Sequence, residues 1–133
     1  VDKIVKDGKE IKTRPEISKP ILSQETVTQL NSMLVSVVEN GFHGVAKIPG
    51  YWIAGKTGTA QVPRKDGRGY EEDKTIQSFV GYAPAFNPQF LIFIKLNNPD
   101  VPASSLSAVP LFKELAQYIF NYWKIPPDYE VPE

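Results

Sequence analysis

The segment at residues 50–61, GYWIAGKTGTAQ, contains the residue types and spacing best suited to chemistry. If it is a strand, Thr57 and Thr59 present hydroxyls on one face, while Lys56 projects toward the other. Gly58 between them leaves room for a ligand backbone beside the strand. Two hydroxyls and a nearby ammonium suit a carboxylate, because each hydrogen bond to a charged group contributes about 1.5–3 kcal/mol. We therefore expect a carboxylate-binding strand that lines a cleft.

Two other interpretations of this segment remain open. Gly50, four residues and then Gly-Lys-Thr at 55–57 satisfy the phosphate-loop pattern. A phosphate loop requires a helix after its lysine, whereas Gly58 and Pro63 disfavour a helix here, so nucleotide binding is disfavoured. The plain alternative is an ordinary edge strand with a surface lysine.

Composition narrows the functional classes. The 133 residues carry 15 Lys plus Arg against 15 Asp plus Glu, no cysteine and one histidine, His43. The absence of cysteine excludes disulfides, thiolate zinc sites and cysteine nucleophiles. With only one histidine as well, we expect no metal site, and we expect no cofactor. The neutral balance disfavours nucleic acid as a partner. Without a run of roughly 18 apolar residues or a signal-peptide pattern, we expect the chain to be soluble.

Hydrophobic spacing and turn residues divide the chain into five stretches. In order they are a hairpin at 1–13, a helix at 23–40, three antiparallel strands within 51–96, a second helix at 107–124 and a tail at 125–133. Strands and helices are segregated rather than alternating, so the predicted class is α+β, an antiparallel sheet flanked by helices.

Turn and cap residues define the boundaries of these elements. Asp7-Gly8 suits a tight hairpin turn. Ser23 and Ser107 can cap the two helices, and Gly41 can end the first helix in the left-handed conformation. We expect a polar loop at 63–74 and a frayed tail.

Aromatic residues offer a further binding hypothesis. They could form a platform for a sugar, but large aromatics usually dominate cores. We therefore assign Trp52, Tyr118, Tyr122 and Trp123 to the core, together with Leu115 of the second helix.

Three segments resemble the penicillin-binding proteins. Residues 54–61 resemble the family's third motif, Lys-Thr-Gly. Residues 78–84, SFVGYAP, look like the strand that follows this motif, and residues 109–116, VPLFKELA, look like the last helix. The likeness is closest to the monofunctional class B transpeptidases of division and elongation. It implies the C-terminal part of a penicillin-binding/β-lactamase-like transpeptidase domain, within a serine D,D-transpeptidase that cross-links peptidoglycan stem peptides through an acyl-enzyme.

The resemblance also implies a role for each residue of the motif. Lys56 would maintain the electrostatics and proton network beside the nucleophile. Thr57 and Thr59 would bind the terminal carboxylate of a D-Ala-D-Ala donor or of a β-lactam, and Gly58 would allow its close approach. The Thr59 backbone N–H would be one of two oxyanion-hole donors, and Gln61 would flank the cleft.

Two further motifs of the family are missing. No serine is followed three positions later by lysine, and none is followed two positions later by asparagine. Ser-x-x-Lys would supply the nucleophile and its base, and Ser-x-Asn the proton relay. We therefore expect a C-terminal portion of a transpeptidase domain that is inactive by itself. The first residue, Val1 rather than Met, also suggests an upstream segment.

The expected partners follow from the resemblance. They are stem peptides, β-lactams and the N-terminal half of the domain, with membrane attachment only through an anchor outside this chain, at the extracytoplasmic face of the bacterial membrane. Apolar surface intended for the missing half could also cause self-association. The alternative is a non-catalytic binding module on the same fold.

Overall fold

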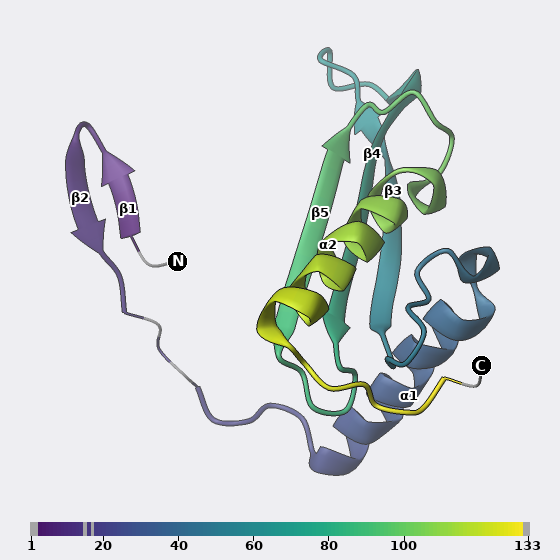
Figure 1. The fold of residues 1–133 in the computed structure, drawn as a ribbon. Coiled ribbons are helices and arrows are strands. Elements are labelled where there is room, and N and C mark those ends of the chain that lie inside the picture. The colour runs from purple at the N-terminus through teal and green to yellow at the C-terminus, as the bar shows by residue number, and fades with distance from the viewer. Residues whose placement is uncertain (1–2, 15, 17, 132–133) are drawn as a thin grey trace.

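The structure is a computed structural model that describes residues 3–14, 16 and 18–131. Its elements confirm the expected α+β class (Figure 1). They are β1 (Lys3–Lys6), β2 (Lys9–Lys12), α1 (Gln24–Asn40), the 3-10 turn η1 (Phe42–Gly44), β3 (Ala54–Pro63), β4 (Tyr70–Ala83), β5 (Phe90–Asn97), the 3-10 turn η2 (Ser104–Leu106) and α2 (Ala108–Trp123).

The first two strands form an isolated hairpin. Strands β1 and β2 are antiparallel, and the turn between them has positive φ at Asp7 (52°) and Gly8 (75°), as the sequence predicts. All residues of the two strands are exposed, and Figure 1 shows the hairpin apart from the larger sheet. A lone hairpin is marginally stable, so this element does not position the candidate site.

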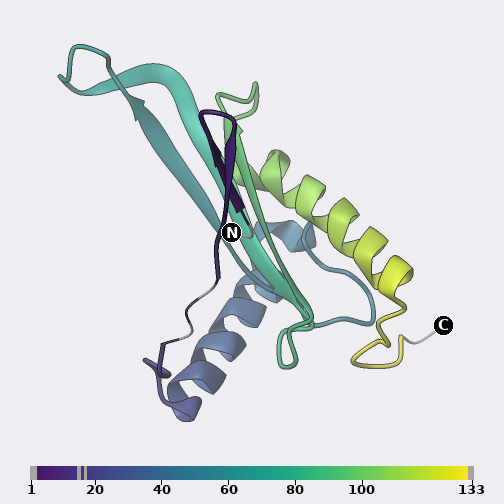
Figure 2. The same cartoon turned by 90° about the vertical axis from the view of Figure 1, so that its left-hand side faces the viewer.

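The larger sheet has the antiparallel order β3-β4-β5, and the two helices lie on its opposite sides (Figure 2). Side chains of β4 alternate between these sides. Phe79 packs edge-to-face on Phe112 of α2, with ring centroids 4.8 Å apart. Tyr82, on the other side, donates its hydroxyl to Asn31 Oδ1 of α1 at 2.7 Å. Strand β4 is therefore covered on both faces, and β3 is attached along one of its edges.

The main core lies between the sheet and α2. Phe79 and Phe112 are fully buried there. A Cβ on Gly81 would lie 2.6 Å from Phe112 Cε2 and 2.8 Å from Phe79 Cε1, so these rings require glycine at that position. A smaller cluster beside α1 contains Val35, Ala54 and Ala85. Residue 54 thus anchors the start of β3 in the core.

The helix ends confirm one cap prediction and correct another. Ser23 Oγ accepts a hydrogen bond from Thr26 N–H at 3.2 Å, as expected for a cap. Gly41 has φ −96°, so the expected left-handed stop is wrong. Glycine is required there because a Cβ would lie 2.4 Å from the Val37 carbonyl oxygen. A left-handed residue ends the other helix, α2, where Lys124 has φ 54°.

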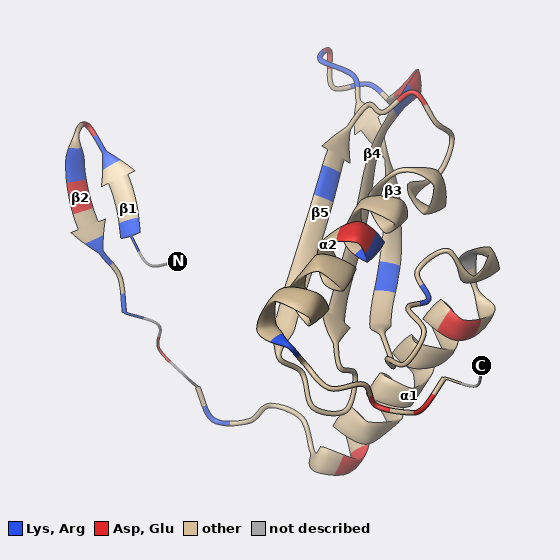
Figure 3. Cartoon of the chain, viewed as in Figure 1, with Lys and Arg blue, Asp and Glu red and all other residues tan. Residues whose placement is uncertain are grey.

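The polar loop is shorter than expected because strand pairing continues into it. Gln61 pairs with Thr75 and, beyond a register shift, Pro63 pairs with Tyr70. Strand β5 pairs with β4 only from Ile76 onward. The β3–β4 ribbon therefore extends past β5 (Figure 1), and charged residues gather at its tip (Figure 3).

The tail after α2 is packed, so the expectation of fraying is wrong. The Tyr51 hydroxyl donates to the Ile125 carbonyl at 2.7 Å, and Trp52 N–H donates to Asp128 Oδ2 at 2.8 Å. The rings of Trp52 and Tyr129 lie 4.8 Å apart. These contacts fix the tail against the segment that leads into β3. Residues 1, 2, 132 and 133 of the expected hairpin and tail lie outside the described residues.

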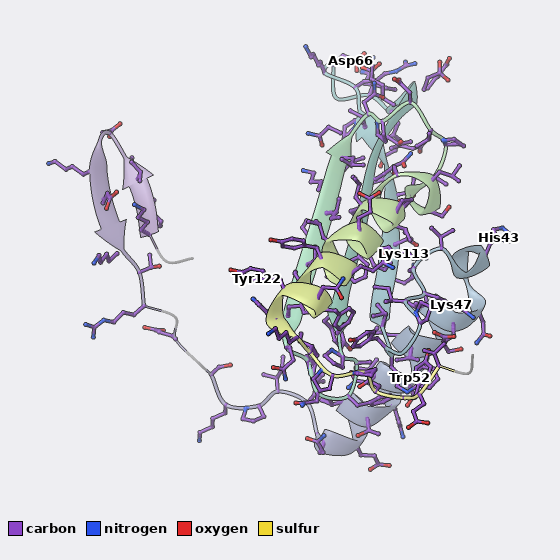
Figure 4. The ribbon with its side chains drawn as sticks, in the orientation of Figure 1. His43, Lys47, Trp52, Asp66, Lys113 and Tyr122 are labelled. Carbon is purple, nitrogen blue, oxygen red and sulfur yellow. The ribbon has the colours of Figure 1, made fainter. Side chains whose placement is uncertain are left out.

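The outer face of α2 is more apolar than predicted. Leu111, Leu115, Tyr118 and Tyr122, which we term the outer stripe, are 42%, 48%, 63% and 69% exposed. Trp123 is also exposed. The expectation of a core role therefore fails for Leu115, Tyr118, Tyr122 and Trp123, and it holds in part for half-buried Trp52. Phe112, Ala116 and Phe120 already fill the sheet-facing side. Figure 4 shows Tyr122 pointing away from α2. Neither described helix is long and apolar enough to cross a membrane.

Candidate carboxylate-binding strand

Strand β3 changes from core to surface at the motif. Ala54 and Gly55 are buried, Lys56 is exposed, and the remaining residues of the strand are exposed or half-buried. In the described sheet β3 pairs only with β4. Alternate residues of such an edge strand direct both N–H and C=O groups outward. The strand thus has a fixed base and an open edge available to a ligand.

Lys56 and Thr57 come together on this edge. Lys56 Nζ donates to the Thr57 carbonyl at 3.0 Å and lies 3.4 Å from Thr57 Oγ1. The expectation that the lysine projects away from the hydroxyls is therefore wrong for its ammonium group. The flexible four-carbon stem lets this group curl around the edge of β3 that is open in the described sheet. The result is an ammonium beside a hydroxyl, which suits an anionic ligand.

Thr57 and Thr59 lie on one face of β3, as the alternation predicts. Thr57 is opposite Phe79 and Thr59 is opposite Gln77, and both partners are buried on the α2 side. The Thr59 hydroxyl is engaged, because its Oγ1 lies 2.8 Å from Ser104 Oγ of η2. The two hydroxyls therefore differ in their availability to a ligand.

Gly58 lies between these threonines, and two serine hydroxyls approach it. A Cβ at this position would lie 2.7 Å from Ser78 Oγ. The Gly58 carbonyl accepts a hydrogen bond from Ser104 Oγ at 2.6 Å, and Ser78 Oγ lies 3.5 Å from the same oxygen. Glycine thus keeps the strand surface low, and Ser78 occupies part of the space it leaves.

Gln61 is exposed and opposite Thr75, where the β3–β4 ladder reaches its register shift. It lies five positions after Lys56, which corresponds to about 16 Å along a strand. Gln61 therefore lies outside the site formed by the Lys56 ammonium.

A buried polar network holds η2 against the sheet. Gln77 is fully buried, and its Nε2 donates to the Val101 carbonyl at 2.6 Å and to Thr75 Oγ1 at 3.1 Å. Ser107 Oγ donates to Gln77 Oε1 at 2.6 Å. The expectation that the Ser107 side chain caps α2 is thus wrong, since Gln77 is its partner. The hydrogen bond from Gln77 to the Val101 carbonyl fixes the segment that leads into η2, which presents Ser104 to β3.

Sequence reasoning missed Ser104, Gln77 and Ser78 as neighbours of the motif. Ser104 follows Gly58 by 46 positions, and Ser104, Ser105 and Ser107 precede a helix, as capping serines commonly do. No signal in one sequence links such distant residues.

The structure excludes the phosphate loop. Lys56 and Thr57 lie inside β3, which continues to Pro63, so no helix N-terminus follows the lysine. Among the residues that the structure describes, no cluster of three or more His, Cys, Asp or Glu could hold a metal ion. The site therefore consists of an ammonium, hydroxyls and a strand edge.

Comparison with known proteins gives these residues a family context. Residues 1–117 match the model of the penicillin binding protein transpeptidase domain. The chain is 36% identical over 112 residues to a peptidoglycan D,D-transpeptidase FtsI homolog of Chlorokybus atmophyticus, covering 83% of this chain and 16% of that protein. It is 37% identical over 123 residues to penicillin-binding protein PbpB of Mycolicibacterium smegmatis, covering 85% and 19%.

Solved structures give the same result. The chain superposes on penicillin binding protein 3 of Mycobacterium tuberculosis, in a complex with ampicillin, with a TM-score of 0.78 and 29% identity, covering all of this chain and 32% of that one. The chain spans less than one fifth of the length of the two curated relatives above. Since the family model covers most of its residues, the chain belongs to the penicillin-binding protein transpeptidase domain family.

Proposed function

We propose that this chain supplies the carboxylate-binding wall of a serine D,D-transpeptidase that cross-links peptidoglycan. The observation that carries the proposal is the Lys56 ammonium beside Thr57 Oγ1 on an open strand edge. An ammonium with a nearby hydroxyl supplies the charge-assisted hydrogen bonds that a terminal carboxylate accepts. The ligands are the D-Ala-D-Ala end of a stem peptide and the carboxylate of a β-lactam.

The proposed roles divide along β3. Lys56 provides positive charge and takes part in the proton network beside the nucleophile. Thr57 and Thr59 bind the carboxylate, and Gly58 keeps the strand surface low. The Thr59 backbone N–H is one oxyanion donor, and Gln61 flanks the bound peptide. This assignment is supported by the open edge of β3 and by the shared face of the two threonines.

The nucleophile comes from polypeptide outside this chain, since Ser-x-x-Lys and Ser-x-Asn do not occur within it. Two exposed surfaces of this chain are available for contact with that polypeptide. Strand β5 has no partner on its outer edge in the described sheet, and its Leu91 and Phe93 are 65% and 60% exposed. The outer stripe of α2 is also exposed. We propose that the remainder of the transpeptidase domain covers both surfaces, at the extracytoplasmic face of the bacterial membrane.

Labelling with a fluorescent penicillin tests this proposal. The chain alone should form no denaturation-resistant adduct, because it lacks the nucleophile. The full-length protein should form one adduct per molecule, and adding the missing part of the domain to the chain should restore labelling. A stoichiometric adduct on the chain alone would overturn the proposed division of the site. A full-length protein that binds no penicillin would favour the non-catalytic module.

Size-exclusion chromatography of the isolated chain tests the proposed covering of its apolar surfaces. Self-association that ends when the missing part is added would support it. A monomer that stays monomeric and exposes little apolar surface to a hydrophobic dye would contradict it.

A further inference from the structure

The Ser104 hydroxyl is buried beside the candidate strand and makes two contacts with one short segment of β3. The residue is 1% exposed. Its Oγ lies 2.6 Å from the Gly58 carbonyl oxygen and 2.8 Å from Thr59 Oγ1. Both distances lie within the usual range of hydrogen bonds between oxygens. Ser104 thus connects η2 to the centre of the motif.

The direction of each hydrogen bond follows from the number of protons. A serine hydroxyl has one proton, and a carbonyl can only accept. Ser104 therefore donates to the Gly58 carbonyl, and Thr59 Oγ1 must donate to Ser104 for the second contact to be a hydrogen bond. The Thr59 proton consequently points toward η2 in this structure.

The Gly58 carbonyl belongs to the same peptide unit as the Thr59 N–H. This peptide is trans, so the two groups point in opposite directions. The carbonyl faces Ser104 of η2 and Ser78 of β4, which lies opposite Gly58 in the ladder. The Thr59 N–H therefore points away from β4, toward the open edge of β3.

We propose that Ser104 is a positioning residue that sets the direction and donor strength of the Thr59 backbone N–H. Its hydrogen bond fixes the peptide plane and polarises the amide, which strengthens the N–H on the opposite side. Oxyanion stabilisation depends on such preorganised donors. The inference rests on the proposed function, in which this N–H stabilises the acylation transition state. It adds a residue that touches neither substrate nor nucleophile.

The test compares Ser104→Ala with Ser107→Ala in the full-length protein. Each variant deletes a buried serine hydroxyl that donates one hydrogen bond at 2.6 Å, but Ser107 donates to Gln77 and does not contact the motif. Acylation by a fluorescent penicillin is followed against concentration, which separates the limiting rate constant from the apparent binding constant. Ser104→Ala should lower the limiting rate constant roughly tenfold, less than the 10²–10³ typical for loss of a donor itself. The apparent binding should stay unchanged or become tighter, because the substitution also frees the Thr59 proton for the carboxylate.

Ser107→Ala should leave both constants within about twofold, because Gln77 keeps its hydrogen bonds to the Val101 carbonyl and Thr75 and so still holds η2. An equal fall in both variants would overturn the inference, because it would show a general structural effect, and so would a change in the binding constant alone. If Ser104→Ala does not fold, Ser104→Cys fills the site with a slightly larger thiol, which is a weaker donor. Its limiting rate constant should fall below that of the wild type, and an unchanged value would overturn the inference.

A second readout separates this inference from the proposed function. In full-length protein labelled with ¹⁵N-threonine, loss of the hydrogen bond to the Gly58 carbonyl should shift the Thr59 amide nitrogen resonance upfield in Ser104→Ala. The same resonance should not move in Ser107→Ala. A wild-type protein that forms no penicillin adduct would overturn the proposed function, while the resonance would still decide whether Ser104 polarises this amide.

Discussion

The two threonines of the motif should contribute unequally to carboxylate binding, and paired valine substitutions test this. Thr57 Oγ1 lies beside the Lys56 ammonium, which can only donate, so the Thr57 proton is available to a ligand. The Thr59 proton is directed to Ser104 Oγ, whose own proton goes to the Gly58 carbonyl. Thr59 can therefore donate to an incoming carboxylate only after its proton leaves Ser104 Oγ.

The expected magnitude follows from the hydrogen bond that each substitution removes. A hydrogen bond to a charged group contributes about 1.5–3 kcal/mol, which corresponds to a roughly 10- to 150-fold change at 1.36 kcal/mol per factor of ten. Thr57→Val should lower the second-order acylation rate constant within this range. Thr59→Val should lower it by less than about fivefold, because redirecting its proton would break an existing hydrogen bond. Valine keeps the shape of threonine, so packing changes little.

The assay uses the full-length protein and two acylating agents, a fluorescent penicillin and its methyl ester. The ester lacks the negative charge, so the difference between Thr57→Val and the wild type should shrink when it replaces the acid. The reasoning is refuted if Thr59→Val causes a loss as large as that of Thr57→Val. It is also refuted if Thr57→Val is impaired equally with acid and ester.

Two further predictions concern stability. Gly81→Ala should lower the free energy of unfolding by about 1–3 kcal/mol, because its Cβ would overlap the buried Phe112 ring. Gly58→Ala should lower it by less, because the Ser78 hydroxyl can rotate away from the new Cβ. Urea titration measures both losses, and equal losses would contradict this prediction. Burial, followed by the Asp128 charge, raises the pKa of Tyr51 above its ordinary value near 10. The folded state therefore keeps this proton where the unfolded state loses it, so stability is complete below about pH 10 and falls as pH rises through the folded-state pKa. In Tyr51→Phe this fall should be shallower, and an unchanged slope in urea titrations from pH 8 to 11 would refute it.

Local patterns in the sequence were sufficient for most of the fold. Asp7-Gly8 forms the predicted positive-φ turn, Ser23 caps α1 as expected, and the three strands are antiparallel. These features depend on residues within a few positions of one another or on simple alternation. Such signals survive in a single sequence because the backbone geometry they require is local.

Predictions failed where a distant part of the chain decides the environment of a residue. Ser107 has the position of a helix cap, but its hydroxyl reaches Gln77, which lies 30 residues earlier. The tail has the composition of a frayed end, yet Asp128 accepts a hydrogen bond from Trp52 N–H. Tyr122 is a large aromatic residue of the kind that often packs in cores, but α2 buries other side chains against the sheet and leaves Tyr122 exposed. Each failure reflects tertiary contacts that residue type and spacing do not encode.

In the candidate site too, local features were predicted and a distant contact was not. Residue types in the motif were enough to predict an ammonium, two hydroxyls and a strand edge for a carboxylate. They could not show that the Thr59 hydroxyl is bound to Ser104, because that contact depends on how β5 and η2 return to β3. A chain with the same motif and alanine at position 104 would release the Thr59 proton from its hydrogen bond, and its Thr59 amide would lose the hydrogen bond that the Gly58 carbonyl accepts. Under the proposed function, the turn that carries Ser104, 45 residues away, therefore affects both ligand recognition by the Thr59 hydroxyl and oxyanion stabilisation by the Thr59 amide.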